Sequence, residues 1–254
     1  MLVSGSVADK PARLVAAGEP VELLSPPMKY VGRGALKLVG ALDRFGLVVS
    51  GLRGLDAGAS TGGFTDVLLQ NGARAVVAVD VGYGQLHERL RADERVDNRE
   101  RTNVRELSPD AIDGPVDIVV ADLSFISLRV VAPALTNLLR PGGELVMLIK
   151  PQFEAGRQEA SKGRGIIREP EIWRRVIGEV QASYNALGID MMDLMVSPLR
   201  GADGNREFLV HGRSSHDESA ADPGRGGSGT PSTTPGAAIG DEVIAAVVTE
   251  AGRP

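Results

Sequence analysis

A glycine-rich turn between two apolar strands constrains the fold of this 254-residue chain most strongly. Residues 55–65 have the sequence LDAGASTGGFT, and a second apolar run, AVVAVD, occupies residues 75–80. Glycine lets backbone N–H groups approach a ligand at the start of a helix, and an acid at the end of the next strand can accept hydrogen bonds from both hydroxyls of a ribose. The pattern predicts a strand, a turn and a helix arranged around a nucleotide-like ligand.

Strand and helix patterns alternate along the rest of the chain. Strands are predicted at 52–57, 75–80, 95–100, 116–122, 143–150, 189–196 and 206–211, and several of them, such as 117–121, are near-continuous apolar runs. Apolar residues at helical spacing predict helices at 32–45, 63–71, 84–91, 127–139 and 170–187. Near-continuous apolar strands that alternate with helices are typical of a mostly parallel sheet covered on both faces. We therefore predict a doubly wound α/β fold with seven strands.

The composition excludes several classes of protein. The chain contains no cysteine, which excludes disulfides, cysteine-ligated zinc and thiol catalysis. No apolar run reaches the roughly 18 residues that a membrane span needs, and no basic segment followed by an apolar core marks the N-terminus. We expect a cytoplasmic protein without a metal site or a membrane segment.

The net charge of −5 is concentrated near the C-terminus. The segment from Ser214 onward holds six acidic and two basic residues, so residues 1–213 carry a net charge of −1. Basic residues cluster at 29–37 and 157–168 and can form one basic face for nucleic acid, although solvated loop charges explain the clusters equally well. The residues that we expect to contact RNA are Lys29, Arg33, Lys162 and Arg164.

A hydrolase is one candidate for the glycine-rich turn. The sequence GASTG at 58–62 matches the G-x-S-x-G nucleophile elbow, in which Ser60 would attack an ester. That chemistry needs a histidine base. His216 falls in the predicted C-terminal tail, and no carboxylate in the sequence pattern marks His87 or His211 as an oriented base. The turn therefore gives little support to a hydrolase.

A methyl-donor site fits the turn better than a dinucleotide site. The glycine spacing departs from the G-x-G-x-x-G of dinucleotide-binding folds, which is a weak signal by itself. Asp56 stands before the turn and Asp80 ends the next strand. S-Adenosylmethionine carries an ammonium that needs carboxylate or carbonyl partners and a ribose that needs an acid. The remaining alternative is that the glycines only shape a turn between strand and helix.

Four charged residues are candidates for the chemistry on the methyl acceptor. Asp122 and Lys150 each end an apolar strand, where a charge is costly to desolvate unless it is paired or used. Lys37 lies on the first predicted helix and Glu207 on the last predicted strand. Each has an equally good explanation as a surface charge. Together they favour transfer to a ribose hydroxyl, a poor nucleophile that needs cationic groups such as lysine nearby.

Five motifs carry a family resemblance. They are GRGALKL at 32–38, DAGASTGGFT at 56–65, DVGYGQ at 80–85, ADLSFIS at 121–127 and KPQFE at 150–154. In length and order they resemble the TlyA family of rRNA 2′-O-ribose methyltransferases, over about residues 1–213. Members of this family have an FtsJ-like catalytic domain with a Rossmann-like methyltransferase sheet and are also labelled haemolysins.

The resemblance implies roles for particular residues. It implies a catalytic tetrad in which Lys150 assists deprotonation while Asp122 and Glu207 orient Lys150 and Lys37. It implies S-adenosylmethionine as the methyl donor, bound by Asp56, Gly58, Ser60, Gly62 and Asp80, with Asn103 near the adenine. The implied partner is rRNA within ribosomal subunits, methylated on cytidine ribose in both the small and the large subunit near their interface.

The N-terminus departs from the family pattern. Family members normally begin with an S4-type RNA-binding domain, and residues 1–24 match only its last portion, with short strand patterns around turns. Either the start codon is assigned too late or the chain is a true truncation, and we favour the first. We expect residues 25–213 to form the methyltransferase domain. Residues 214–254 are expected to be a disordered low-complexity tail with a short helix at 241–251.

Two further functions stay open on the sequence. One is a membrane-active haemolysin, although the chain has no long apolar or strongly amphipathic basic segment. The other is a non-catalytic rRNA-binding or assembly factor that keeps the cofactor fold. The sequence makes no prediction of the oligomeric state. We expect Tyr83, Phe125 and Phe153 to pack in the core rather than to stack on bases.

Overall fold

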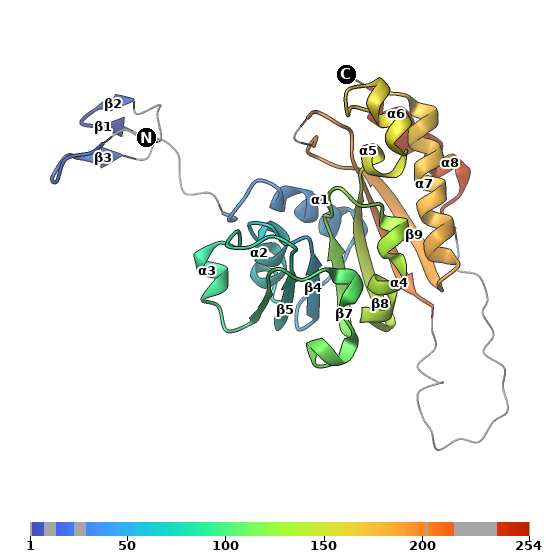
Figure 1. Ribbon diagram of the computed structural model, residues 1–254, viewed down its shortest axis with the longest axis horizontal. Helices are drawn as coiled ribbons and strands as arrows, with labels where there is room; N and C mark the ends of the chain where they lie inside the picture. Colours follow the sequence, from blue (N-terminus) through green and yellow to red (C-terminus); the bar gives the residue numbers. More distant parts are fainter. Residues whose placement is uncertain (1, 8–13, 23–28, 202, 216–237, 254) are drawn as a thin grey trace, which may run out of the picture.

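A seven-stranded sheet forms the centre of the structure (Figure 1). The computed structural model describes residues 2–7, 14–22, 29–201, 203–215 and 238–253. The strands are β4 (Arg53–Ala57), β5 (Ala75–Val79), β6 (Val96–Arg99), β7 (Val116–Ala121), β8 (Leu139–Ile149), β9 (Ile189–Val196) and β10 (Phe208–Ser214). Their order is β6-β5-β4-β7-β8-β10-β9, and β10 runs antiparallel to both of its neighbours. The prediction of a mostly parallel, seven-stranded sheet is confirmed.

Helices cover both faces of the sheet, as predicted (Figure 1). The helices on one face are α1 (Ala35–Phe45), α2 (Gly63–Gln70) and α3 (Glu88–Arg91), and those on the other are α4 (Leu128–Leu138), α7 (Pro170–Asn185) and α8 (Asp241–Ala251). Each face has its own buried apolar cluster. None of the helices in the described part of the chain is long and apolar enough to cross a lipid bilayer.

Helix α8 extends the core beyond the predicted domain. The helix occupies the predicted residues 241–251, and its apolar side chains Ile244, Val247 and Val248 are buried in the same cluster as α4 and α7. An apolar stripe of this kind is stabilised by the surface that it covers. The disorder expected before this helix, at residues 216–237, lies outside the described residues.

Several short elements differ from the sequence prediction. Helices α5 (Pro151–Glu154) and α6 (Arg157–Lys162) and the 3₁₀ turns η1 (Val104–Glu106) and η2 (Pro109–Ile112) are too short to show helical periodicity in the sequence. Strand β8 begins four residues earlier than predicted, because Leu139 already pairs with Val116 of β7 before a register shift that ends at the pair Ile118 and Glu144. Helix α3 begins only at Glu88, where the ring Nδ1 of His87 accepts a hydrogen bond from the Arg89 N–H.

The N-terminal residues form a small sheet of their own. Strands β1 (Leu2–Val3), β2 (Ser6–Val7) and β3 (Val21–Glu22) pair in the order β2-β1-β3, and both pairings are antiparallel. Each strand has two residues. This agrees with the expected short strands around turns.

The order of the main sheet predicts where a ligand binds. The chain starts in the middle of the sheet at β4, moves outward to β6, and then crosses back to β7 on the other side of β4. In open α/β sheets, ligands bind at the carboxyl ends of the strands, where the order reverses. In this structure that position lies beyond the ends of β4 and β7.

Core packing under α4 can be tested with a matched pair of substitutions. Leu135→Ala removes a fully buried side chain and is expected to lower the free energy of unfolding by about 2–5 kcal/mol, because the helix cannot close the cavity. Val130 lies on the same helix with 51% of its surface exposed, so Val130→Ala should change stability by about 0.5 kcal/mol or less. Urea denaturation measures both. Equal losses would show that α4 does not pack as described.

Candidate active site

A pocket of about 580 Å³ lies beyond the carboxyl ends of β4, β7 and β8. Lys37 reaches it from α1, while Asp122 and Lys150 follow the last residues of β7 and β8. Glu207 comes directly before β10, whose first residue, Phe208, pairs with Ile149 at the end of β8. Because β10 is antiparallel, its start lies at the same edge as the ends of the parallel strands. The structure therefore brings all four predicted charged residues together.

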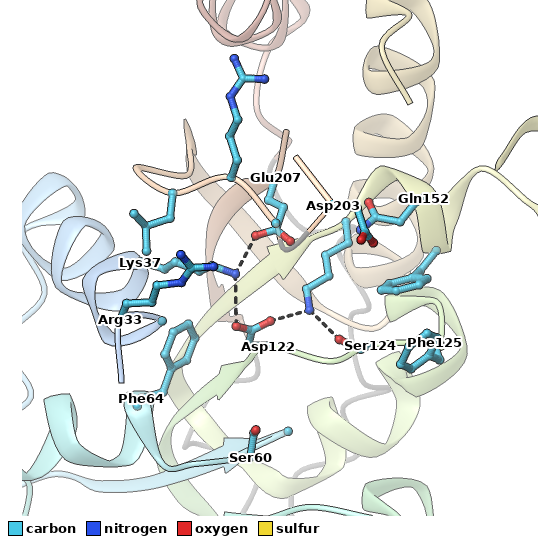
Figure 2. Close-up of a pocket in the computed structure, with 18 of the residues that line it drawn as sticks. Arg33, Lys37, Ser60, Phe64, Asp122, Ser124, Phe125, Gln152, Asp203 and Glu207 are labelled. Atoms are coloured by element: carbon cyan, nitrogen blue, oxygen red, sulfur yellow. Dashed lines mark hydrogen bonds and ion pairs between the residues drawn. The ribbon is translucent and has the colours of Figure 1, made fainter. Parts of the chain in front are cut away.

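The Asp122 carboxylate is shared between the two lysines (Figure 2). Its Oδ1 lies 2.6 Å from Nζ of Lys150, and its Oδ2 lies 3.5 Å from Nζ of Lys37. Lys37 makes a second, shorter ion pair of 2.7 Å with Oε2 of Glu207. Two cations and two carboxylates thus form one chain from Glu207 to Lys150.

The four paired side chains are largely shielded from water, which strengthens the attraction between their charges. The Glu207 side chain is 3% exposed and the Lys150 side chain is 9% exposed. A buried charge must be paired, because desolvation costs several kcal/mol per ion. The two positive and two negative side chains satisfy this requirement while leaving both ammonium groups at the pocket wall.

Ser124 is a pocket residue that the sequence analysis missed. Nζ of Lys150 donates a hydrogen bond of 2.8 Å to Oγ of Ser124, which lines the pocket (Figure 2). Lys150 is therefore held by two acceptors, Ser124 and Asp122, both from the loop after β7. The position of Ser124 in the motif ADLSFIS, two residues after Asp122, was the available signal.

The glycine-rich turn packs directly against the loop that follows β7. Gly58 has a positive φ of 87°, and a Cβ at this position would lie 2.7 Å from the carbonyl oxygen of Asp122. Only glycine allows this approach. The turn is further fixed by Asp80 at the end of β5, whose carboxylate accepts the N–H groups of Ser60 at 2.8 Å and Gly82 at 2.7 Å.

Asp56 is completely buried at the end of β4. Its Oδ2 accepts two hydrogen bonds from Thr65 in α2, from the N–H at 2.8 Å and from Oγ1 at 2.7 Å. Its Oδ1 has no hydrogen-bond partner. Burial raises the pKa of Asp56 from 3.8 to about 7, against the opposing effect of the Thr65 hydrogen bonds, and the charges of Asp122 and Asp80 raise it further. The carboxyl group lines the pocket. A cation bound beside it would lower its pKa and favour the ionised form.

Gly62 and Asn103 have structural contacts of their own. Gly62 caps α2 with a φ of 93°, and a Cβ there would clash with the side chain of Leu90 in α3. Oδ1 of Asn103 accepts the Arg105 N–H and caps η1. Its neighbour Thr102 donates its N–H to the Asp80 carbonyl oxygen at 2.9 Å, which places Asn103 near the end of β5. Neither residue lines the pocket.

The contacts of Ser60 do not support a hydrolase. Its Oγ hydrogen-bonds Oε1 of Gln85 at 3.2 Å, and in the described part of the chain no histidine ring contacts it through a hydrogen bond. His211 does have a carboxylate partner, Glu144, at 2.7 Å. However, His211 lies on β10, and β8 and β7 separate that strand from β4.

Two aromatic residues are exposed, contrary to the expectation of core packing. Phe125 is 92% exposed and Tyr83 is 65% exposed. Phe125 has a φ of 65°, in the loop after β7, and its ring meets the half-buried Phe153 at a centroid distance of 5.2 Å. The guanidinium of Arg101 covers the Tyr83 ring at 3.9 Å. Both residues lie in loops at the carboxyl edge of the sheet. Strand and helix patterns in the sequence therefore could not predict their exposure.

The four basic residues expected to contact RNA are all exposed. Of these, only Arg33 lines the pocket. Lys162 ends α6 and Arg164 follows it in a turn, next to the pocket residues Ala160 and Gly165, whereas Lys29 lies over the Tyr30 ring. A further exposed cation at the pocket, Arg200, was not predicted.

Comparisons with known proteins agree with this geometry. Residues 30–214 match the FtsJ-like methyltransferase family. The chain belongs to this family. It is 46% identical over 223 residues to the 16S/23S rRNA (cytidine-2′-O)-methyltransferase TlyA of Mycobacterium tuberculosis, covering 87% of this chain and 83% of that protein. This FtsJ-like enzyme is therefore a methyltransferase of the TlyA type.

The haemolysin label also occurs among proteins similar to this FtsJ-like methyltransferase. Hemolysin A of Brachyspira hyodysenteriae is 37% identical over 83% of this chain and 88% of its own length. A structure from Streptococcus thermophilus, described as a hemolysin, superposes with a TM-score of 0.80 at 40% identity, covering 97% of this chain and 83% of that chain.

The ionisation of Asp56 has a measurable effect on stability. Because its folded-state pKa of about 7 lies above 3.8, the folded state holds the proton more tightly, and stability is lost as the pH rises from about 4 to about 7. Asp56→Asn removes this loss. We expect the unfolding free energy of the variant, relative to the wild type, to rise by up to about 4 kcal/mol between pH 4 and pH 8. Parallel curves in urea denaturation would contradict the raised pKa.

Proposed function

We propose that this methyltransferase uses S-adenosylmethionine to methylate the 2′-hydroxyl of cytidine in the rRNA of both ribosomal subunits, in the cytoplasm. The observation that carries the proposal is the Asp122 carboxylate, which holds two buried lysines beside the Gly58 turn. A donor turn and a pair of cations at one edge of the sheet suit transfer to a poorly nucleophilic hydroxyl. The cytidine and the two rRNA targets come from the name of the Mycobacterium tuberculosis relative.

The residues present fit S-adenosylmethionine. The unpartnered, buried Oδ1 of Asp56 provides an acceptor for the donor's ammonium. Gly58 lets the turn pack against the backbone of Asp122, which a Cβ would prevent. Each carboxylate oxygen of Asp80 accepts one backbone N–H and keeps capacity for a ribose hydroxyl. Ser60 positions Asp80 through its N–H. Gly62 and Asn103 lie outside the pocket lining and support the site from the start of α2 and from the loop near the end of β5.

The four charged residues divide the chemistry on the acceptor. When bound, the donor supplies a methyl group on a sulfonium centre, which is transferred by direct displacement. Nζ of Lys150 accepts the proton that leaves the 2′-hydroxyl. Lys37 stabilises the developing alkoxide, because a preorganised cation in a buried pocket needs no reorganisation during the reaction. Asp122 and Glu207 keep the ammonium groups oriented.

The rim of the pocket suits a single nucleotide of RNA. Arg33 and Arg200 are exposed cations at the pocket and provide partners for backbone phosphates. Phe125 presents an almost fully exposed ring at the same pocket. Aromatic rings at such positions stack on unpaired bases, which are the targets of sequence-specific RNA recognition. Lys29, Lys162 and Arg164 extend the basic surface beyond the pocket.

Mapping of ribose methylation tests the proposed function directly. Cells without the gene should lack 2′-O-methylcytidine at defined rRNA positions, and mass spectrometry of rRNA fragments should show its return with the wild-type gene. Lys150→Met should reduce transfer by about 10²-fold or more, because a positioned proton acceptor is lost, while the purified variant still binds the donor. Arg174→Met, an exposed substitution on α7, is the control. An unchanged methylation map in the deletion strain would overturn the proposal.

Stacking on Phe125 gives a separate prediction. Phe125→Ala should weaken RNA binding by about 1–3 kcal/mol, the value of one base stacked on an aromatic ring, and Phe125→Tyr should retain it. Fluorescence anisotropy with rRNA fragments measures the affinity. Val130→Ala, on the nearby helix α4, removes exposed apolar surface outside the pocket and should leave RNA binding unchanged. Equal affinities for Phe125→Ala and wild type would contradict base stacking.

A further inference from the structure

A buried carboxylate next to the proposed proton acceptor takes no part in the chemistry described above. Glu154 is the last residue of α5, one helical turn after Lys150, and its side chain is 1% exposed. Oε1 accepts the N–H of Leu128 at 2.6 Å, and Oε2 accepts the hydroxyl of Ser127 at 2.5 Å. These two residues start helix α4, whose first N–H groups have no partner within the helix. Glu154 thus satisfies the start of a helix that belongs to a different segment.

Arg129 strengthens the same connection from the other side. Its Nη2 donates to the carbonyl oxygen of Glu154 at 2.8 Å, and its Nε lies 3.4 Å from the carboxylate. Its Nη1 pairs with Glu179 of α7 at 2.6 Å. The side chain and the backbone of Glu154 are therefore both bound to the first turn of α4. We call this set of contacts between Glu154 and Ser127–Arg129 the α4–α5 clamp.

The clamp joins the two loops that hold Lys150. The first loop runs from Asp122 to Ser127 after β7, and the second, which includes the single turn of α5, runs from Lys150 to Glu154 after β8. Lys150 has both of its acceptors, Asp122 and Ser124, in the first loop. Any shift of one loop against the other would therefore change both distances at Nζ. The two loops are linked at their starts by the pair of Lys150 with Asp122, and at their ends by the clamp between Glu154 and Ser127–Arg129.

The first loop needs such a constraint. Phe125 has a φ of 65°, a conformation that costs a residue other than glycine of order 1 kcal/mol or more. Strained backbone persists only where its surroundings over-determine it. The loop is fixed at one end by the Asp122 N–H, which donates to the Ala57 carbonyl oxygen at 3.0 Å, and at the other end by Glu154.

We propose that Glu154 is a positioning residue that sets the distance of Lys150 from Asp122 and Ser124 before any substrate binds. This inference rests on the proposed function, because it assigns the clamp to the turnover of that site. A carboxylate is suited to the role, since it accepts from the Ser127 hydroxyl and the Leu128 N–H at once and favours the positive end of α4. Loss of the clamp leaves Lys150 in the pocket with a wider range of positions.

Three substitutions test the clamp, with one matched control. Glu154→Ala removes all side-chain contacts, Ser127→Ala removes one hydrogen bond and is the variant that folds if Glu154→Ala does not, and Glu154→Gln keeps an oxygen for the Leu128 N–H. Glu179→Gln is the control, because it removes the other carboxylate partner of Arg129 without touching either loop. We expect kcat to fall at least tenfold in Glu154→Ala, to recover in part in Glu154→Gln, and to stay at the wild-type value in Glu179→Gln.

Measuring kcat and KM separately distinguishes a positioning role of Glu154 from a role in folding alone. Positioning predicts a lower kcat per donor-binding molecule with unchanged KM for the donor, whereas a folding defect lowers the number of donor-binding molecules and leaves their kcat intact. Wild-type kcat per binding-competent molecule in both Glu154→Ala and Ser127→Ala would overturn the proposal.

A measurement without turnover distinguishes failure of the clamp from failure of the proposed function. The chain contains five lysines, so the side-chain ¹⁵N signals can be assigned individually, and a buried, hydrogen-bonded ammonium exchanges its protons slowly with water. Glu154→Ala should speed exchange at Lys150 and leave exchange at Lys37, held by Glu207, unchanged. Faster exchange in an enzyme that methylates no rRNA would retain the clamp and reject the function. Unchanged exchange at Lys150 in an active enzyme would reject the clamp.

Discussion

The two oxygens of one carboxylate, on Asp122, hold the site together. One oxygen pairs with Lys150 and the other faces Lys37, so residues from β7, β8 and α1 meet at a single side chain. The backbone of the same residue contacts the position where Gly58 lacks a Cβ. The acceptor half and the donor half of the pocket therefore share one residue, Asp122.

The sheet topology explains how these distant residues come together. Parallel strands have their carboxyl ends at one edge, so Asp122 and Lys150, which follow the adjacent strands β7 and β8, lie close together. Glu207 reaches that edge only because β10 reverses direction. A parallel strand in this place would deliver the end of its preceding connection to the opposite edge. The single antiparallel strand is therefore part of the site as much as of the fold.

The sequence predicted the sheet and the charged residues well because both depend on local signals. The central strands β5 and β7 and the second half of β8 were visible as near-continuous apolar runs, and Asp122 and Lys150 stood out as charges at strand ends. Ser124 and the α4–α5 clamp were not predicted, since a serine or glutamate in a loop gives no periodic signal and its partner lies in another segment. The exposure of Phe125 was missed for the same reason: it is set by the backbone conformation of a loop, and hydrophobicity alone favours the core.

The position of Glu207 also determines when the pocket exists during synthesis of the chain. Lys37 emerges early and Glu207 emerges late, with nearly the whole domain between them, and the pair they form is one of the shortest in the site. A nascent chain that has completed the glycine-rich turn, β7 and β8 contains Asp122 but still lacks Glu207, the nearer of the two carboxylate partners of Lys37. Glu207, the last of the four charged residues to be synthesised, therefore leaves the ribosome only after strands β4 to β9 have been translated.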